Sequence, residues 1–138
     1  MSLEKAVEDF QWDPLSAGYA LAAVKDGGLQ LLDLERNVVV RTFDRQTQGI
    51  SSVVWLPRQP GNFVTSSSRV GVLRLWTVSK PAPISFYKVG SAGVNMMAGA
   101  LHNPDVVLVS TRAGSVLLAD VALKKVEFAS RPLSLWSI

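Results

Sequence analysis

The segment Val70-Gly71-Val72-Leu73-Arg74-Leu75-Trp76-Thr77-Val78 joins a turn glycine to an apolar strand that ends in an aromatic residue. Similar segments precede and follow it. The turn glycines Gly27, Gly71 and Gly114 stand 44 and 43 residues apart. Five residues after each glycine comes a matched triplet, namely Leu32-Asp33-Leu34, Trp76-Thr77-Val78 and Ala119-Asp120-Val121. A period near 43 residues indicates three copies of one structural unit.

Each copy contains four short apolar segments that are rich in Val, Leu and aromatic residues and bounded by turn-forming residues. We expect about twelve strands, at 9–12, 20–24, 29–34, 38–43, 50–55, 63–66, 72–78, 84–88, 94–101, 106–110, 116–121 and 126–129. No window has a sustained apolar pattern at helical spacing, so the pattern predicts an all-β fold. Four strands in each unit of this length are typical of a β-propeller blade.

A second motif recurs in phase with the glycines. Trp12-Asp13-Pro14 returns 43 residues later as Trp55-Leu56-Pro57, and Leu101-His102-Asn103-Pro104 is a weaker third copy. We expect Trp12 and Trp55 to end the first strand of their units and to pack between neighbouring blades, with the prolines stopping the strand. Trp76 is expected in the same inter-blade core, whereas Trp136 falls outside the repeat.

On these features the chain resembles the WD repeat β-propeller family, named for a Trp-Asp pair that closes the third strand. Here Asp33 and Asp120 supply the acid and Trp76 the aromatic residue, and the Gly-His dipeptide that often opens such repeats is absent. The family's His–Ser–Asp–Trp hydrogen-bond network is therefore not expected in any blade. Segments 9–16, 60–65, 70–76 and 124–128 are similar to a much longer family member, which implies a fragment or shortened relative without enzyme activity.

The expected organisation is one incomplete propeller over residues 1–138. Blade 1 covers about 6–44, blade 2 about 49–88 and blade 3 about 93–130, and residues 131–138 open a fourth blade. Propellers close with about four to eight blades, so three would leave apolar faces and strand edges exposed. We expect the partners to be other proteins, together with remaining blades in a longer chain or further copies of this chain.

Composition narrows the class of protein. Hydrophobic residues make up 48% and charged residues 18% of the 138 residues, which excludes a disordered tail. The longest apolar runs are far too short to span a bilayer, and the N-terminus lacks a signal-peptide apolar stretch. With no Cys and a single His, no usual zinc site is expected. The sequence predicts an intracellular, cytoplasmic chain without cofactor or metal.

Catalytic motifs are also absent from the sequence, including GxGxxG, GxSxG and HExxH. His102 is the only candidate general base between Arg45 and Pro104, and it falls in an expected turn. The run Ser66-Ser67-Ser68 has the features of a strand end followed by a turn. We therefore expect no enzyme activity, and an enzyme that relies on His102 is the weakest alternative.

Basic residues follow the same repeat. Residues 1–44 hold eight acids against four bases, whereas 45–104 hold six bases and no carboxylate. Lys25, Arg69 and Arg112 each stand two residues before a turn glycine, and Arg45 lies in the loop before blade 2. Such turns emerge on one face of a propeller, although exposed turn residues are often basic for no functional reason. Asp26, directly before Gly27, is expected to have a structural role.

Two functions are compatible with this arc of positive charge. The preferred one is a non-catalytic protein–protein interaction scaffold that docks an acidic or phosphorylated partner segment through Arg forks. The alternative is a module that binds phosphoinositide head groups or RNA with the same face. Because the basic residues are dispersed, nucleic acid is the less expected ligand.

Overall fold

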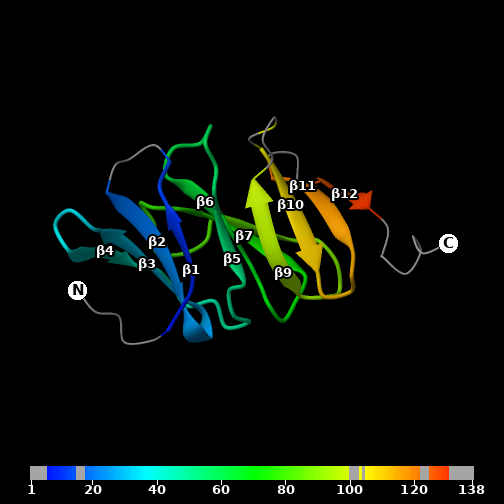
Figure 1. Cartoon of the computed structure of the whole chain (residues 1–138), viewed down its shortest axis with the longest axis horizontal. Coiled ribbons are helices and arrows are strands. Elements are labelled where there is room, and N and C mark those ends of the chain that lie inside the picture. The colour runs from blue at the N-terminus through cyan, green and yellow to red at the C-terminus, as the bar shows by residue number, and fades with distance from the viewer. Residues whose placement is uncertain (1–5, 15–17, 100–102, 104, 122–124, 131–138) are drawn as a thin grey trace.

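The computed structural model describes residues 6–14, 18–99, 103, 105–121 and 125–130, except the side chains of Lys25 and of residues 127–130. These residues form three antiparallel four-stranded sheets, each from four consecutive strands (Figure 1). The chain is thus an all-β, incomplete propeller, and we call the sheets blades 1, 2 and 3. The expected start of a fourth blade at 131–138, including Trp136, lies outside the described residues, as does His102.

Within each blade the strands pair in the order in which they occur in the sequence. Blade 1 contains β1 (Val7–Trp12), β2 (Tyr19–Val24), β3 (Gly28–Asp33) and β4 (Val38–Thr42). Blade 2 contains β5 (Ser52–Trp55), β6 (Asn62–Ser66), β7 (Val72–Thr77) and β8 (Ser85–Lys88). Blade 3 contains β9 (Val94–Gly99), β10 (Val106–Thr111), β11 (Val116–Asp120) and β12 (Lys125–Ser130).

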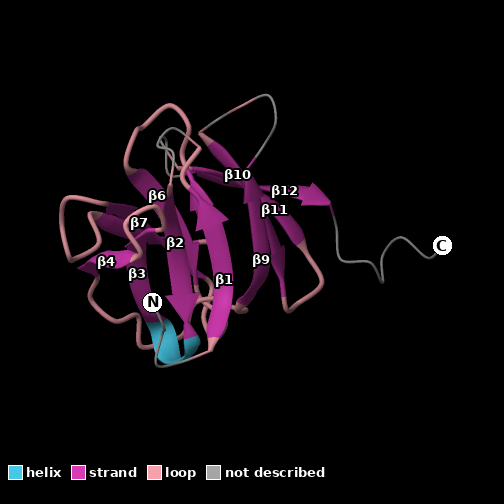
Figure 2. Ribbon diagram, turned by 60° about the vertical axis from the view of Figure 1, so that its left-hand side comes forward, coloured by secondary structure: helices cyan, strands magenta, loops and turns pink. Residues whose placement is uncertain are grey.

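All the expected strands are present in the described residues, and the only helix there is the three-residue 3-10 helix η1 (Lys25–Gly27) (Figure 2). The largest boundary differences at a strand start are two residues, at β1, which begins at Val7 rather than at Asp9, and at β5, which begins at Ser52 rather than at Ile50. Ile50 is buried although it lies in the preceding loop, because its side chain joins the core between blades 1 and 2. Its apolar character therefore reflects burial rather than strand pairing.

The first strands of the three blades lie side by side, in the order β1, β5, β9 (Figure 1). Each of these strands belongs to a separate sheet, so no backbone ladder pairs them with one another. Hydrogen bonds between a side chain and a backbone N–H join them instead. The Val53 backbone N–H donates to Oδ2 of Asp9 at 2.8 Å. The Met97 N–H donates to Oγ of Ser52, also at 2.8 Å. These bonds satisfy strand-edge donors that would otherwise be unpaired, and so fix the position of each blade against the next.

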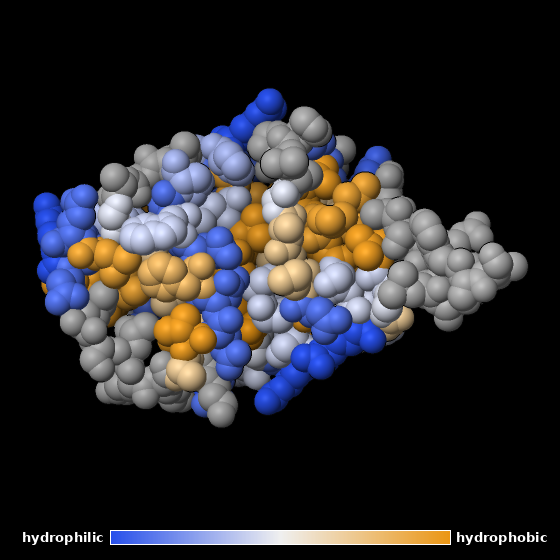
Figure 3. All heavy atoms as spheres, viewed as in Figure 1, coloured by the Kyte–Doolittle hydropathy of each residue, from blue (hydrophilic) through white to orange (hydrophobic). Residues whose placement is uncertain are grey.

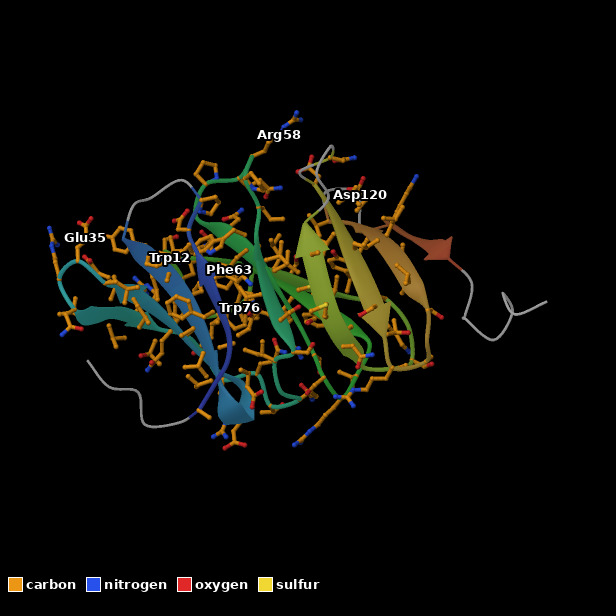
Figure 4. The ribbon with its side chains drawn as sticks, in the orientation of Figure 1. Trp12, Glu35, Arg58, Phe63, Trp76 and Asp120 are labelled. Carbon is orange, nitrogen blue, oxygen red and sulfur yellow. The ribbon has the colours of Figure 1, made fainter. Side chains whose placement is uncertain are left out.

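An aromatic cluster fills the space between blades 1 and 2. Phe63 and Trp76 are almost fully buried, and their rings stack with centroids 6.1 Å apart (Figure 4). Phe43 meets both rings edge-on, and Trp55 meets Phe63 in the same way. The expected inter-blade positions of Trp55 and Trp76 are confirmed.

A second, aliphatic cluster holds blades 2 and 3 together. Its buried members include Val64 and Leu73 from blade 2 and Val107, Val109 and Leu117 from blade 3. These side chains alternate with others along their strands, because successive residues of a strand point to opposite faces of the sheet. Blade 2 is therefore covered by apolar contacts on both faces.

Trp12 differs from the expectation. Its side chain is 58% exposed and lies on the face of blade 1 that points away from blade 2, where it meets Phe10 edge-on at 5.9 Å (Figure 4). Trp55 occupies the same place in blade 2, but there blade 1 covers it. The prediction of a buried Trp12 was wrong, because no described blade covers that face of blade 1.

The turn glycines serve two different purposes. Gly27 and Gly114 have φ values of 86° and 84°, in the left-handed region that favours glycine. Gly71 does not adopt a positive φ, contrary to the general expectation for these turns. A Cβ at Gly71 would instead lie 2.2 Å from the carbonyl oxygen of Gly90, so glycine is needed there for the close approach of two backbones.

Candidate functional site

A cavity of about 690 Å³ opens where the turns between second and third strands meet the loops between blades. All three blades contribute to it, with the lining residues Glu8, Val24, Asp26, Arg45, Thr47, Gly49, Ile50, Ser51, Ser68, Arg69, Asn95 and Arg112. We call this cavity the arginine pocket. It lies at the end of the molecule that carries η1, whereas Arg58 extends from the opposite end (Figures 1 and 4).

Three of the four basic residues expected on one face line this pocket: Arg45, Arg69 and Arg112. Arg69 is in the β6–β7 turn, Arg112 in the β10–β11 turn and Arg45 in the β4–β5 loop. The fourth, Lys25, is in η1 between β2 and β3, and its side chain lies outside the described atoms. The 43-residue spacing therefore located residues that the fold brings to one cavity.

Arg45 is held by Asp26. Its Nε donates to the Asp26 carbonyl oxygen at 2.6 Å, and its Nη2 lies 3.7 Å from Oδ2 of the same residue. Asp26 has a φ of 71°, which an Asp tolerates better than most residues. Because both side chains are about half exposed, the ion pair adds little stability, but it orients the guanidinium. The expectation that Asp26 is structural agrees with these contacts.

Arg69 and Arg112 are both exposed, and no ion pair joins either of them to another described residue. Their turns are fixed through the backbone. The Arg69 N–H donates to Oγ of Ser67 at 3.3 Å, and the Arg112 N–H donates to the carbonyl oxygen of Gly93 at 2.9 Å. The pocket also contains the carboxylates of Glu8 and Asp26, so its positive charge is localised at these two arginines.

Gln46 is a buried structural residue that sequence reasoning missed, and it stands between the pocket residues Arg45 and Thr47 in the sequence. The Trp76 indole N–H donates to Oγ1 of Thr65 at 2.9 Å, and the Thr65 hydroxyl donates to Oε1 of Gln46 at 2.7 Å. The Gln46 side-chain amide then donates to the carbonyl oxygens of Ser66, at 3.1 Å, and Gly49. A connected Trp–Thr–Gln network thus links blade 2 to the loop before it, and it differs in its residues from the His–Ser–Asp–Trp network of the family.

This network positions the loop that carries Arg45, Thr47 and Gly49. The loop is also braced by Arg74, whose Nη2 donates to Oε1 of Gln48 at 3.2 Å. Burial lowers the pKa of Arg74, and its Nη1 is buried without a hydrogen-bond partner among the described residues. No sequence pattern singled out Gln46, which stands 19 residues before its partner Thr65.

The serine triplet has the structural role expected from the sequence. Ser66 ends β6, and its hydroxyl lies 2.6 Å from that of Ser51. Ser67 donates to the carbonyl oxygen of Gln48 at 2.9 Å and accepts from two backbone N–H groups of its own turn. Both hydroxyls therefore have local structural partners.

A second hollow, of about 400 Å³, lies at the other end of the first strands. Its lining is largely apolar and includes Trp12, Pro14, Trp55, Pro57 and Met97. Among the described residues, no three His, Cys, Asp or Glu side chains gather as a metal site would require. No helix within the described ranges is long and apolar enough to cross a membrane.

The comparison with protein families gives no assignment, because no family model matches the chain.

Proposed function

We propose that this chain is a non-catalytic protein–protein interaction scaffold of the WD-repeat type, which docks an acidic or phosphorylated segment of a partner protein in the arginine pocket. The observation that carries the proposal is that Arg45, Arg69 and Arg112 line one cavity although they come from separate turns and loops. Guanidinium groups bind carboxylate and phosphate through paired, charge-assisted hydrogen bonds.

The arginines have different roles in this proposal. Arg69 and Arg112 provide the charge for the ligand, since neither forms an ion pair with a described residue. Arg45 is oriented by Asp26 and supports the rim of the pocket. Asn95 also lines the pocket, and its Nδ2 donates to the Thr111 carbonyl oxygen at 3.2 Å.

The two carboxylates of the pocket favour a short anionic segment over a long polyanion. Glu8 and Asp26 line the same cavity as the arginines and would repel the evenly spaced phosphates of RNA. A peptide with one phosphate or a few carboxylates can place its charge at Arg69 and Arg112 alone. Phosphoinositides and RNA are therefore the second choice.

The test is fluorescence anisotropy with a labelled acidic peptide that contains one phosphoserine. We expect the double variant Arg69→Glu/Arg112→Glu to weaken binding at least tenfold, since each charge-assisted hydrogen bond contributes about 1.5–3 kcal/mol. Arg58→Glu is the matched control, because Arg58 is also exposed but lies at the opposite end of the molecule (Figure 4). Equal affinities for the double variant and wild type would refute the proposal.

A salt titration separates the two ligand classes. For a peptide that contacts two arginines, the logarithm of the affinity should fall with that of the salt concentration with a slope no steeper than about −2. An RNA or a phosphoinositide vesicle that binds more tightly than the peptide, with a steeper slope, would favour the alternative function.

A further inference from the structure

The same kind of hydrogen bond occurs at both junctions between blades. At the first, Asp9 on β1 accepts from the Val53 N–H, and at the second, Ser52 on β5 accepts from the Met97 N–H. Asp9 and Ser52 hold equivalent positions, because each stands three residues before the Trp that ends its strand. A side-chain oxygen at this position therefore receives a backbone N–H from the first strand of the next blade.

Blade 3 lacks this oxygen. Ser52 pairs with Ser66 across blade 2, and the residue that pairs with the corresponding Ser110 in blade 3 is Met96. Met96 is 64% exposed, and Leu108 on the same face is 39% exposed. A blade that packs against this face would meet an apolar surface without an acceptor for its first-strand N–H.

Blade 1 does not need that acceptor. The N–H of Phe10 corresponds to those of Val53 and Met97, and it donates to Oδ1 of the adjacent Asp9 at 2.8 Å. The outer face of blade 1 is apolar as well, because Phe10 is 40% and Trp12 58% exposed. Figure 3 shows apolar surface over both blade 1 and blade 3.

We propose that blade 1 of one copy of this chain packs on blade 3 of a second copy, so that two copies close a six-bladed ring. Blade 1 matches blade 3, because the Phe10 N–H of blade 1 already donates to Asp9 and blade 3 offers no side-chain acceptor. Phe10 and Trp12 would cover Met96 and Leu108, a favourable contact of aromatic rings with a thioether and an aliphatic side chain. A blade with an unsatisfied first-strand N–H is disfavoured there, because burying it is costly.

The existing junction also indicates a partner for the Trp12 indole. Trp55 Nε1 donates to the Gln11 carbonyl oxygen of the preceding blade at 3.2 Å. The position equivalent to Gln11 in blade 3 is Ala98, which is exposed on β9. In the ring, Trp12 Nε1 of one copy donates to the Ala98 carbonyl oxygen of the other.

Symmetry makes two copies sufficient. A head-to-tail contact closes when the rotations sum to a full turn, and the three described blades of each copy give six, within the range of four to eight in known propellers. Both junctions are then identical, and no face of the described blades stays open. This assembly is independent of the ligand in the arginine pocket.

The first test is the mass of the chain in solution, by light scattering or sedimentation. We expect a species of twice 14.9 kDa over roughly a hundredfold range of concentration. Trp12→Glu and Met96→Glu should each give monomers, and circular dichroism should confirm that both variants fold. Phe86→Glu is the control, because Phe86 is 69% exposed on β8, away from both end faces, and this variant should remain a dimer.

Mixing the two variants tests the head-to-tail arrangement. Each variant alone has one blocked face, but the intact blade 3 of Trp12→Glu can join the intact blade 1 of Met96→Glu. The mixture should therefore contain a two-copy complex that neither variant forms alone. A monomeric wild type would assign these faces to other blades and overturn the proposal. A wild-type species of more than two copies would also overturn it, and so would a mixture of the two variants in which no complex forms.

Discussion

Replacing Gln46 by Ala tests how the arginine pocket depends on the core between blades 1 and 2. Gln46 is 2% exposed, and its side chain makes three hydrogen bonds, to the Thr65 hydroxyl and to the carbonyl oxygens of Gly49 and Ser66. The variant removes all three and leaves the Thr65 hydroxyl without the acceptor that it uses. Thr65 in turn accepts the Trp76 indole N–H, so the change extends to the aromatic cluster.

The expected cost follows from these contacts. Each hydrogen bond contributes about 1 kcal/mol net, so the loss of three lowers the free energy of unfolding by about 3 kcal/mol. Domains of ordinary stability have about 5–15 kcal/mol in total. For a chain of this size, such a loss lowers the melting temperature by roughly 10 °C.

Urea denaturation followed by tryptophan fluorescence measures this loss. Gln11→Ala is the matched control, because Gln11 is exposed and its side chain bonds only an exposed Asp9 oxygen among the described residues. We expect that control to change the free energy of unfolding by no more than about 0.5 kcal/mol. A cost for Gln46→Ala as small as the control's would refute the view that this network holds the loop.

Three further predictions concern single residues. Gly27→Ala should lower the free energy of unfolding by more than about 1 kcal/mol, because Gly27 has a φ of 86° and a Cβ there would lie 1.7 Å from the Gln46 carbonyl oxygen. Gly90→Ala is the control and should be nearly neutral in the same denaturation assay, because a Cβ at Gly90 would meet nothing within 4 Å. Ser52→Ala should cost about 1–2 kcal/mol because the buried Met97 N–H loses its acceptor, and Ser52→Thr should recover most of that cost. Tyr87→Phe should be neutral or stabilising near pH 7, because the buried hydroxyl has no hydrogen-bond partner among the described residues. Burial, and then the charge of Asp120, raises the pKa of Tyr87, so the folded state holds the phenol proton more tightly than the unfolded chain does. The free energy of unfolding should therefore be unaffected by this group below the unfolded-state pKa of about 10 and should fall at higher pH. Tyr87→Phe should show a smaller alkaline loss in pH-dependent denaturation.

The strands were predictable because they depend on local patterns. Alternating apolar residues and turn formers located every strand that the structure describes, and the 43-residue repeat grouped them into blades. The same repeat placed Arg69 and Arg112 on one face, since equivalent turns of neighbouring blades lie at the same end of a propeller. Both the grouping of strands into blades and the shared face of the two arginines follow directly from the 43-residue period of the sequence.

The details that were missed depend on contacts between segments distant in the sequence. Asp26 and Arg45 are 19 residues apart, and neither residue type indicates that the guanidinium would bond the Asp26 carbonyl oxygen. Gln46 and Thr65 meet only because the β4–β5 loop folds over the end of β6. Trp12 repeats the position of Trp55 but not its burial, because burial depends on the neighbouring blade.

The most direct test of the proposed function is a nuclear magnetic resonance titration that observes the arginine Nε–H groups of the wild-type chain. On addition of the acidic phosphoserine peptide, we expect the resonances of Arg69 and Arg112 to shift together and to saturate at one stoichiometry, while that of Arg58 stays unchanged. Shifts at Arg58 as large as those at Arg69 and Arg112 would instead indicate unspecific charge attraction. That result, or no shift at the two pocket arginines, would contradict the assignment of the arginine pocket as the docking site.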